Sequence, residues 1–461
     1  MDGMVESVLP GSLSGSRTVL RRTRILLLAL MATVPIVAVW PPDPFDPFFG
    51  IKATVILVLG SVLACWWVFL WFSKWRPAVR LTSVLVLWLS LASWLTLSTL
   101  LSVDPPGAVW GSPGREDGLL VWLAGLAAFA TSVTLPRAAN WRIIWLSISA
   151  CAVVVSAYAI AQHFGFDPLS SPVALARARS SGTLRNPLFL GGYLALVAPM
   201  AMAWCLLAKK AWVRWGLAPA SFGLVLAALY FTFSRAAWLG TLGGIALFAG
   251  WVFWQRRAET PVLLAQLAVA LAVALALGLV PQAVRADAEP HSLPGEAATI
   301  AALNDPRNAG RLAIWEISLR MVGDRPWFGV GLDQMGTIFE AYRTERITQA
   351  EGPGTWDRAH SDPLQLAVVA GIPAVLFFYA LVAAAVARSR KKWTAFQSEG
   401  MMWAGVTAGL VGYLAQSLVS ITVPGVHTLF FILLGGLAAR ADPLAPVARE
   451  CNFGSVPTCV Q

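Results

Sequence analysis

Long, uninterrupted apolar segments dominate this sequence and limit what it can fold into. Blocks of about 18 or more apolar residues are too long for strands and too uniform for the amphipathic helices of a soluble domain. Only 13% of the residues are charged, whereas soluble domains carry about 25%. The chain is therefore predicted to be an all-α integral membrane protein. A soluble enzyme, a nucleic-acid-binding protein and a disordered scaffold are excluded.

The apolar blocks predict about twelve transmembrane helices and one long helical loop on the outer side. The first block is interpreted as a retained span, because Val39-Trp40-Pro41-Pro42 lacks the small residues of a signal-peptide cleavage site. The approximate ranges of the spans are 25–40, 51–72, 81–101, 119–134, 143–164, 188–207, 215–233, 236–254, 262–280, 364–387, 401–421 and 424–439.

The positions of Lys and Arg predict the orientation of the chain. With both termini in the cytoplasm, every inside segment is basic and most of the 34 Lys and Arg residues lie inside, as the positive-inside rule requires. The high pI near 9.8 therefore reflects cytoplasmic loops rather than nucleic-acid binding. The predicted parts are cytoplasmic tails at 1–24 and 440–461, membrane helices over 25–280 and 364–439, and a periplasmic or outer loop at 281–363.

A few cations break this rule, because they fall in short outer connections or at their edges. Such residues are candidates for binding an anionic ligand on the outer face, although contact with lipid headgroups is an alternative for any one of them. They are Lys52, Arg115, Arg177, Arg179, Arg185 and Arg235.

The long outer loop carries two helical patterns, at Ala309–Val322 and Leu332–Thr348. Each is predicted to be an amphipathic helix that lies against the membrane face or packs into a small outer cap. In the first pattern Leu312, Trp315, Leu319 and Val322 are spaced to share one face.

The residues that re-enter the membrane after this loop include His360, one of only four histidines in the chain. Arg358 and Asp362 flank it, which makes it a functional candidate. The sequence contains no nucleotide-binding loop, zincin helix or serine-nucleophile elbow. Asp43 and Asp46 on the first outer loop are candidate metal ligands, but the Pro-rich stretch around them more simply predicts a turn, so no metal and no cofactor are predicted.

Five stretches, taken together and in this order, resemble the bacterial O-antigen ligase and O-antigen polymerase superfamily. The resemblance covers about residues 100–440 and implies a GT-C-like membrane glycosyltransferase. The stretches are Ser181–Pro187 followed by Gly191–Leu194; Thr232–Gly240, similar to a T-x-S-R-G/A pattern; Gly310-Arg311 with Trp315; Arg325–Gly331, similar to a Pro-x-x-Gly-x-Gly turn; and Ala359–Leu364, similar to an H-N/S-x-x-L pattern.

The resemblance also implies roles for individual residues. His360 matches the proposed catalytic histidine, and Arg235 and Arg311 match arginines that engage the diphosphate of an undecaprenyl-diphosphate-linked glycan. Further candidates for binding the diphosphate or glycan are Arg115, Arg185, Asn186, Trp315 and Arg358. The implied reaction is an inverting, metal-independent glycosyl transfer on the periplasmic face of the bacterial inner membrane.

The acceptor stays open between lipid A–core for a ligase, a lipid-linked repeat unit for a polymerase and a protein hydroxyl for an oligosaccharyltransferase. A ligase is preferred slightly, and a transporter of lipid-linked sugars is the more distant alternative. The chain departs from the family at Val368-Val369-Ala370, where relatives often have an acidic residue before the glycine matching Gly371. The acid/base partner of His360 is therefore unassigned.

Overall fold

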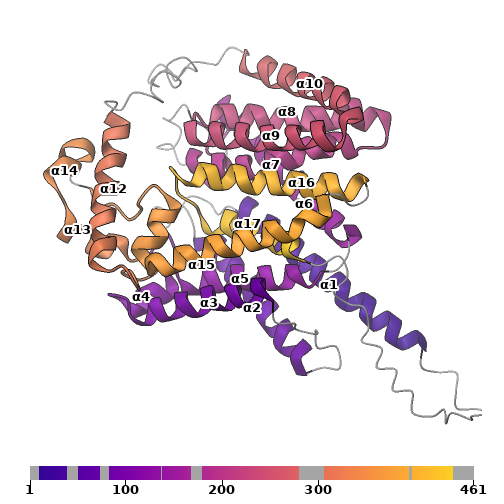
Figure 1. The fold of residues 1–461 in the computed structure, drawn as a ribbon. Coiled ribbons are helices and arrows are strands. Elements are labelled where there is room, and N and C mark those ends of the chain that lie inside the picture. Colours follow the sequence, from indigo (N-terminus) through magenta and orange to yellow (C-terminus); the bar gives the residue numbers. More distant parts are fainter. Residues whose placement is uncertain are drawn as a thin grey trace, which may run out of the picture.

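The computed structural model describes an all-helical protein, which confirms the predicted fold class. The described residues are 10–38, 50–72, 82–135, 138–167, 179–279, 306–352, 354–393 and 397–439, and among them no strand is present. Most of the long helices run side by side in one bundle, and α12, α13 and α14 lie together at one end of it (Figure 1).

Each of the predicted spans corresponds to a helix in the structure. Eight helices of the described part are long and apolar enough to cross a membrane, and α5 and α17 are shorter apolar helices. The chain is thus a multi-pass membrane protein, while the count of twelve spans stays a prediction. The helices are α1 Pro10–Val37, α2 Gly50–Phe72, α3 Ser83–Leu100, α5 Leu119–Val133, α6 Ala138–His163, α7 Pro187–Leu207, α8 Ala218–Phe231, α9 Arg235–Gln255, α10 Thr260–Gly278, α15 Asp362–Trp393, α16 Gln397–Ser417 and α17 Pro424–Ala438.

Helix α7 lies at the centre of the bundle and packs against α8, α9 and α16. Its apolar stretch is 89% buried, compared with 17% for the peripheral α10. Glycines bring the central backbones close together. A Cβ at Gly240 of α9 would meet the carbonyl of Gly412 in α16, and one at Gly409 would meet the carbonyl of Leu196 in α7. Small residues at such crossings are typical of helices that pack inside a membrane.

Lys52 near the start of α2 is a structural residue and not an exposed outer cation. Its side chain is 2% exposed, and Nζ donates to the carbonyls of Pro35, Ile36 and Ala38 at 2.9, 3.0 and 2.8 Å. These carbonyls lie at the C-terminal end of α1, where a cation is favoured by both the unpaired acceptors and the helix dipole. This placement corrects the interpretation of Lys52 as a candidate for ligand binding.

The segment between α10 and α15, which is predicted to lie on the outer side, contains α12 Pro306–Asp324, α13 Met335–Tyr342 and α14 Glu345–Glu351. The first predicted helix is confirmed. The second is wrong as a single helix, because Arg343 leaves the helical conformation and the Thr344 hydroxyl caps α14 by accepting from Ile347 N.

The predicted inner face of α12 is also wrong in part. Ile314, Ile317 and Met321 are fully buried, whereas Leu319 is 61% exposed. Helix α12 packs on α14 and α15, and the residues that face these two helices form a stripe adjacent to the one predicted from apolar spacing.

Helix α15 is interrupted near its start, where a continuous span was predicted. Gly371 has φ 81° and ψ 169°, which breaks the helix into a short first part and a long second part. The turn between α12 and α13 fills the break: Val330 N donates to Val368 O at 2.9 Å, and Ile372 N donates to Pro326 O at 2.8 Å. Backbone groups inside a membrane must be paired within the protein, and here a loop segment supplies the partners.

Candidate active site

The candidate site is built on residues 354–361, which we call the His360 loop. This loop connects the outer helices to α15 and carries His360 in a left-handed backbone conformation with φ 52°. A non-glycine residue in this region costs roughly 1–2 kcal/mol, and such strain persists only where surrounding contacts enforce it.

Contacts on both sides of His360 hold the loop in place. Arg115 binds Asp357 in a bidentate pair, with Nε–Oδ2 and Nη2–Oδ1 distances of 2.5 and 3.2 Å. On the other side, Ala359 N donates to Gln365 Oε1 at 2.6 Å, and Thr422 N donates to Asp362 Oδ1 at 3.0 Å.

Arg358 forms the most deeply buried ion pairs of the His360 loop. Its Nη1 lies 3.2 Å from Asp117 Oδ2 and its Nη2 lies 2.8 Å from Asp333 Oδ1. The Asp333 carboxylate also accepts from the backbone N–H groups of Ser112 and Asp117. Both terminal nitrogens of Arg358 therefore face carboxylates, and these contacts lend no support to the predicted role of Arg358 in binding a diphosphate.

His360 is kept neutral by its surroundings. Burial lowers the pKa of its imidazole to about 4, and the positive charge of Arg311 lowers it further. The Trp356 ring lies edge-on at 5.4 Å between centroids. A neutral imidazole can accept a proton from a hydroxyl group, so the structure brings a potential general base close to the Arg311 cation from α12.

Several buried polar atoms of the His360 loop and of α12 have no hydrogen-bond partner within the described part of the chain. They are His360 Nδ1, Trp356 Nε1 and Trp315 Nε1. Trp315 lies one helical turn after Arg311, so both side chains share one face of α12. Because buried polar groups are nearly always paired, these atoms mark a place for water or a substrate.

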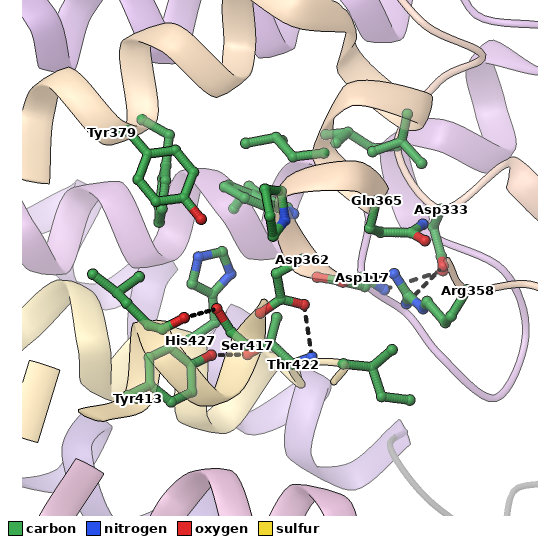
Figure 2. Close-up of a pocket in the computed structure, with 18 residues that line it drawn as sticks. Asp117, Asp333, Arg358, Asp362, Gln365, Tyr379, Tyr413, Ser417, Thr422 and His427 are labelled. Atoms are coloured by element: carbon green, nitrogen blue, oxygen red, sulfur yellow. Dashed lines mark hydrogen bonds and ion pairs between the residues drawn. The ribbon is translucent and has the colours of Figure 1, made fainter. Parts of the chain in front are cut away.

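A polar pocket lies next to the His360 loop, with about 650 Å³ of empty space including its mouth. Figure 2 shows Arg358 between Asp117 and Asp333 on one side of the pocket, and Asp362, Tyr413, Thr422 and His427 on the other. The polar residues lining it are Asp117, Asp333, Arg358, Asp362, Gln365, Tyr379, Tyr413, Ser417, Thr422 and His427.

Sequence reasoning missed Asp117 and Asp333, which complete this site. Burial raises the pKa of Asp117 to about 7, although the nearby Arg358 opposes the shift. A signal was present, since acidic residues are scarce in this chain and both lie two residues before the start of a helix. Nothing in the sequence, however, indicates that the two carboxylates share one arginine.

Arg235, Arg185 and Asn186 take no part in the contacts of the His360 loop described above. Arg235 is the first residue of α9, and Asn186 caps α7 by accepting from Leu188 N at 2.8 Å. Arg185 is in a left-handed turn before that cap. Helix α9 and the next helix, α10, run in opposite directions. Because α10 ends on the side of the bundle where α12 lies, Arg235 at the start of α9 belongs to the same end as α12 (Figure 1).

Arg179 supports the junction between α8 and α9 that carries Arg235. Its Nε donates to Thr232 O at 2.8 Å and its Nη2 to Phe233 O at 3.1 Å. Arg177, Asp43 and Asp46 lie outside the described residues. Among the residues that the structure does describe, no group of three or more His, Cys, Asp or Glu side chains could hold a metal ion.

Comparison with known families agrees with the motifs. Residues 220–379 match the model of the O-antigen ligase family, a range that includes Arg235, Arg311 and His360. This match confirms the resemblance to the O-antigen ligase and polymerase superfamily and points to a membrane glycosyltransferase of that type. No curated protein matches the chain.

Proposed function

We propose, from the premise that residues 220–379 carry an O-antigen ligase domain, that the protein transfers a glycan from an undecaprenyl-diphosphate-linked donor to an acceptor hydroxyl. The reaction would take place on the periplasmic face of the bacterial inner membrane. The observation that carries the proposal is the neutral, partly buried His360 close to the cation of Arg311.

The proposed chemistry is a single inverting displacement. The acceptor oxygen forms a bond to the anomeric carbon, the bond from that carbon to the diphosphate oxygen breaks, and the diphosphate leaves on its polyprenyl chain. His360 takes the proton of the acceptor hydroxyl. A neutral imidazole is the form that can do so, and general-base assistance contributes about 10²–10⁴-fold to a rate.

The leaving diphosphate gains negative charge as the glycosidic bond breaks. Arg311 and Arg235 are assigned to stabilise it, because guanidinium groups stay ionised and bind phosphate oxygens in pairs. Arg235 also begins a helix, where unpaired backbone N–H groups favour an anion. Arg185, Asn186, Arg115 and Trp315 are secondary candidates for the diphosphate or the first sugars.

Lipid A–core is the acceptor we favour, which makes the protein a ligase. A lipid-linked repeat unit would make it a polymerase, and a protein hydroxyl would make it an oligosaccharyltransferase. The polar side chains of the site gather at one end of the bundle, which suits transfer at a membrane surface better than transport through the midplane.

The test uses purified protein in lipid nanodiscs with an undecaprenyl-diphosphate-linked glycan and each acceptor in turn, with and without EDTA. His360→Ala and Arg311→Ala are expected to reduce transfer at least about 100-fold. Arg320→Ala is the matched control, because Arg320 lies on the same helix and pairs with Glu316 at an exposed position. Transfer by His360→Ala at the rate of the unmodified protein would disprove the assignment, and loss of activity in EDTA would disprove metal independence.

A further inference from the structure

Three segments that are far apart in the sequence meet behind the His360 loop. They are residues 111–118 before α5, residues 331–334 before α13, and the loop itself. Asp333 joins them, because its carboxylate accepts from Ser112 N at 2.7 Å and Asp117 N at 3.3 Å and lies 2.8 Å from Arg358 Nη2. Its backbone carbonyl also accepts from the Ser112 hydroxyl at 2.6 Å.

These ion pairs are shielded from water. The side chains of Asp333, Asp117 and Arg358 are 0%, 6% and 9% exposed. A buried pair contributes little net stability when complete, but removal of one partner leaves an unpaired charge that the surrounding structure must accommodate. Loss of the Asp333 charge should therefore move Arg358, which is two residues from His360.

Movement of Arg358 would directly affect His360, whose backbone is strained. His360 holds its left-handed conformation only while the residues on both sides are fixed. Arg115 fixes Asp357, Gln365 fixes the backbone of Ala359, and the buried carboxylates fix Arg358 between them. Arg358 lies between two carboxylates, those of Asp117 and Asp333.

We propose that Asp333, acting through Arg358 and supported by Asp117, is a positioning residue that holds His360 in its catalytic place. This inference rests on the proposed function for the role of His360 as a base. It assigns Arg358 to the support of the loop rather than to the diphosphate. Asp333 and Asp117 touch no reacting atom in this scheme.

The position of His360 can be followed through its titration. The charged groups that face it are Arg311 from α12, Arg115 from the segment before α5, and Asp357 in its own loop, and burial is the dominant influence on its pKa. If the loop is released into water, the pKa should rise from about 4 toward the ordinary value of about 6.5. A change that merely reduced the amount of folded protein would leave the pKa unaltered.

The experiment compares Asp333→Asn with the unmodified protein, with His360→Ala and with Glu316→Gln. The last is a matched control, because it removes the charge of an exposed carboxylate on α12 that pairs with Arg320 and Arg346, outside the His360 loop. Two quantities are measured: the pH dependence of kcat, and the rate at which diethyl pyrocarbonate modifies His360, followed by peptide mapping. Asp117→Asn is measured in the same way and replaces Asp333→Asn if that variant fails to fold.

The expected result for Asp333→Asn is a fall in kcat of about 10–100-fold, with a smaller change in KM. The acid limb of the kcat profile should move toward about pH 6.5, and modification of His360 should be at least about fivefold faster. Glu316→Gln should match the unmodified protein in all three. A reduced kcat with an unshifted acid limb and unchanged modification would overturn the inference, and so would an unaltered kcat.

If the proposed function itself is wrong, the same experiment gives a different pattern of results. If His360→Ala retains transfer, the role of His360 as a base is wrong, while the modification rate still shows whether Asp333 holds the loop. If His360→Ala is inactive and Asp333→Asn behaves like Glu316→Gln, the positioning role alone is wrong.

Discussion

The backbone N–H of Val330 donates to the carbonyl of Val368 at 2.9 Å, so a turn of the outer loop completes the hydrogen bonding of membrane helix α15. The next residue repeats the contact, from Gly331 N to Val369 O at 3.0 Å. The first part of α15, which follows the His360 loop, is therefore hydrogen-bonded to the turn between α12 and α13.

Gly371→Ala tests whether this interruption is required. Gly371 has φ 81°, and a Cβ there would meet the backbone carbonyl of Trp327, which cannot move without disturbing the turn. We expect a loss of unfolding free energy of about 2 kcal/mol or more, measured as a lower Tm in detergent. Gly243→Ala in α9 is the control, since nothing lies within 4 Å of its Cβ position and it should leave Tm unchanged or higher.

The fold was largely predictable because apolar blocks of membrane length have few alternatives. The interruption of α15 was not predicted, although Gly371 and Pro373 within one apolar block were a usable signal. Helix α12 was placed correctly, but its buried face was partly wrong. Leu319 and Met321 are both apolar, and the packing of α12 on α14 and α15 determines which of them is buried.

The candidate site was only partly predictable. His360 and Arg311 were identified through motifs, and the structure brings them together. The pairing of Arg358 with Asp117 joins residues 241 positions apart, and no local pattern encodes it. Lys52 was misinterpreted for a related reason, because its three acceptors belong to a different helix whose end could not be aligned with α2 from the sequence.

Lys52→Met tests the structural role of that lysine. The substitution leaves the carbonyls of Pro35, Ile36 and Ala38 without their donor, so we expect a loss of roughly 3 kcal/mol in stability and a correspondingly lower Tm. The KM for the lipid-linked donor should change by less than about twofold. Lys210→Met, at an exposed position between α7 and α8, is the control and should alter neither value. A raised KM with an unchanged Tm would instead support ligand binding by Lys52.

The pH dependence of the unmodified protein follows from the environment of His360. With the pKa of the imidazole lowered to about 4, the base stays neutral and kcat should vary by less than about twofold between about pH 5.5 and pH 8. An unperturbed histidine would instead give a fall centred near pH 6.5. A profile with that midpoint would contradict the burial of His360.

The lowered pKa of His360 also makes the stability of the folded protein depend on pH, and the direction of this dependence can be derived. Because the folded state binds the His360 proton less tightly than the unfolded state, the contribution of His360 is fully present above about pH 6.5 and is lost as the pH falls toward 4. His360→Gln should remove this dependence, so its denaturant midpoint should fall less between about pH 7 and pH 5. An equal fall in both proteins would show that other groups are responsible.

The orientation predicted from Lys and Arg can be tested with single cysteines in a background from which the five native cysteines have been removed. Glu345→Cys introduces a thiol at the start of α14, in the outer loop, and Lys210→Cys introduces one between α7 and α8. Both positions are exposed, so accessibility depends only on the side of the membrane. A membrane-impermeant maleimide should label the first in spheroplasts and the second only after permeabilisation. Arg235, at the start of α9, lies at the same end of the bundle as α12 and α14. The reverse labelling pattern would therefore place His360, Arg311 and Arg235 on the cytoplasmic side. That result would exclude transfer on the periplasmic face.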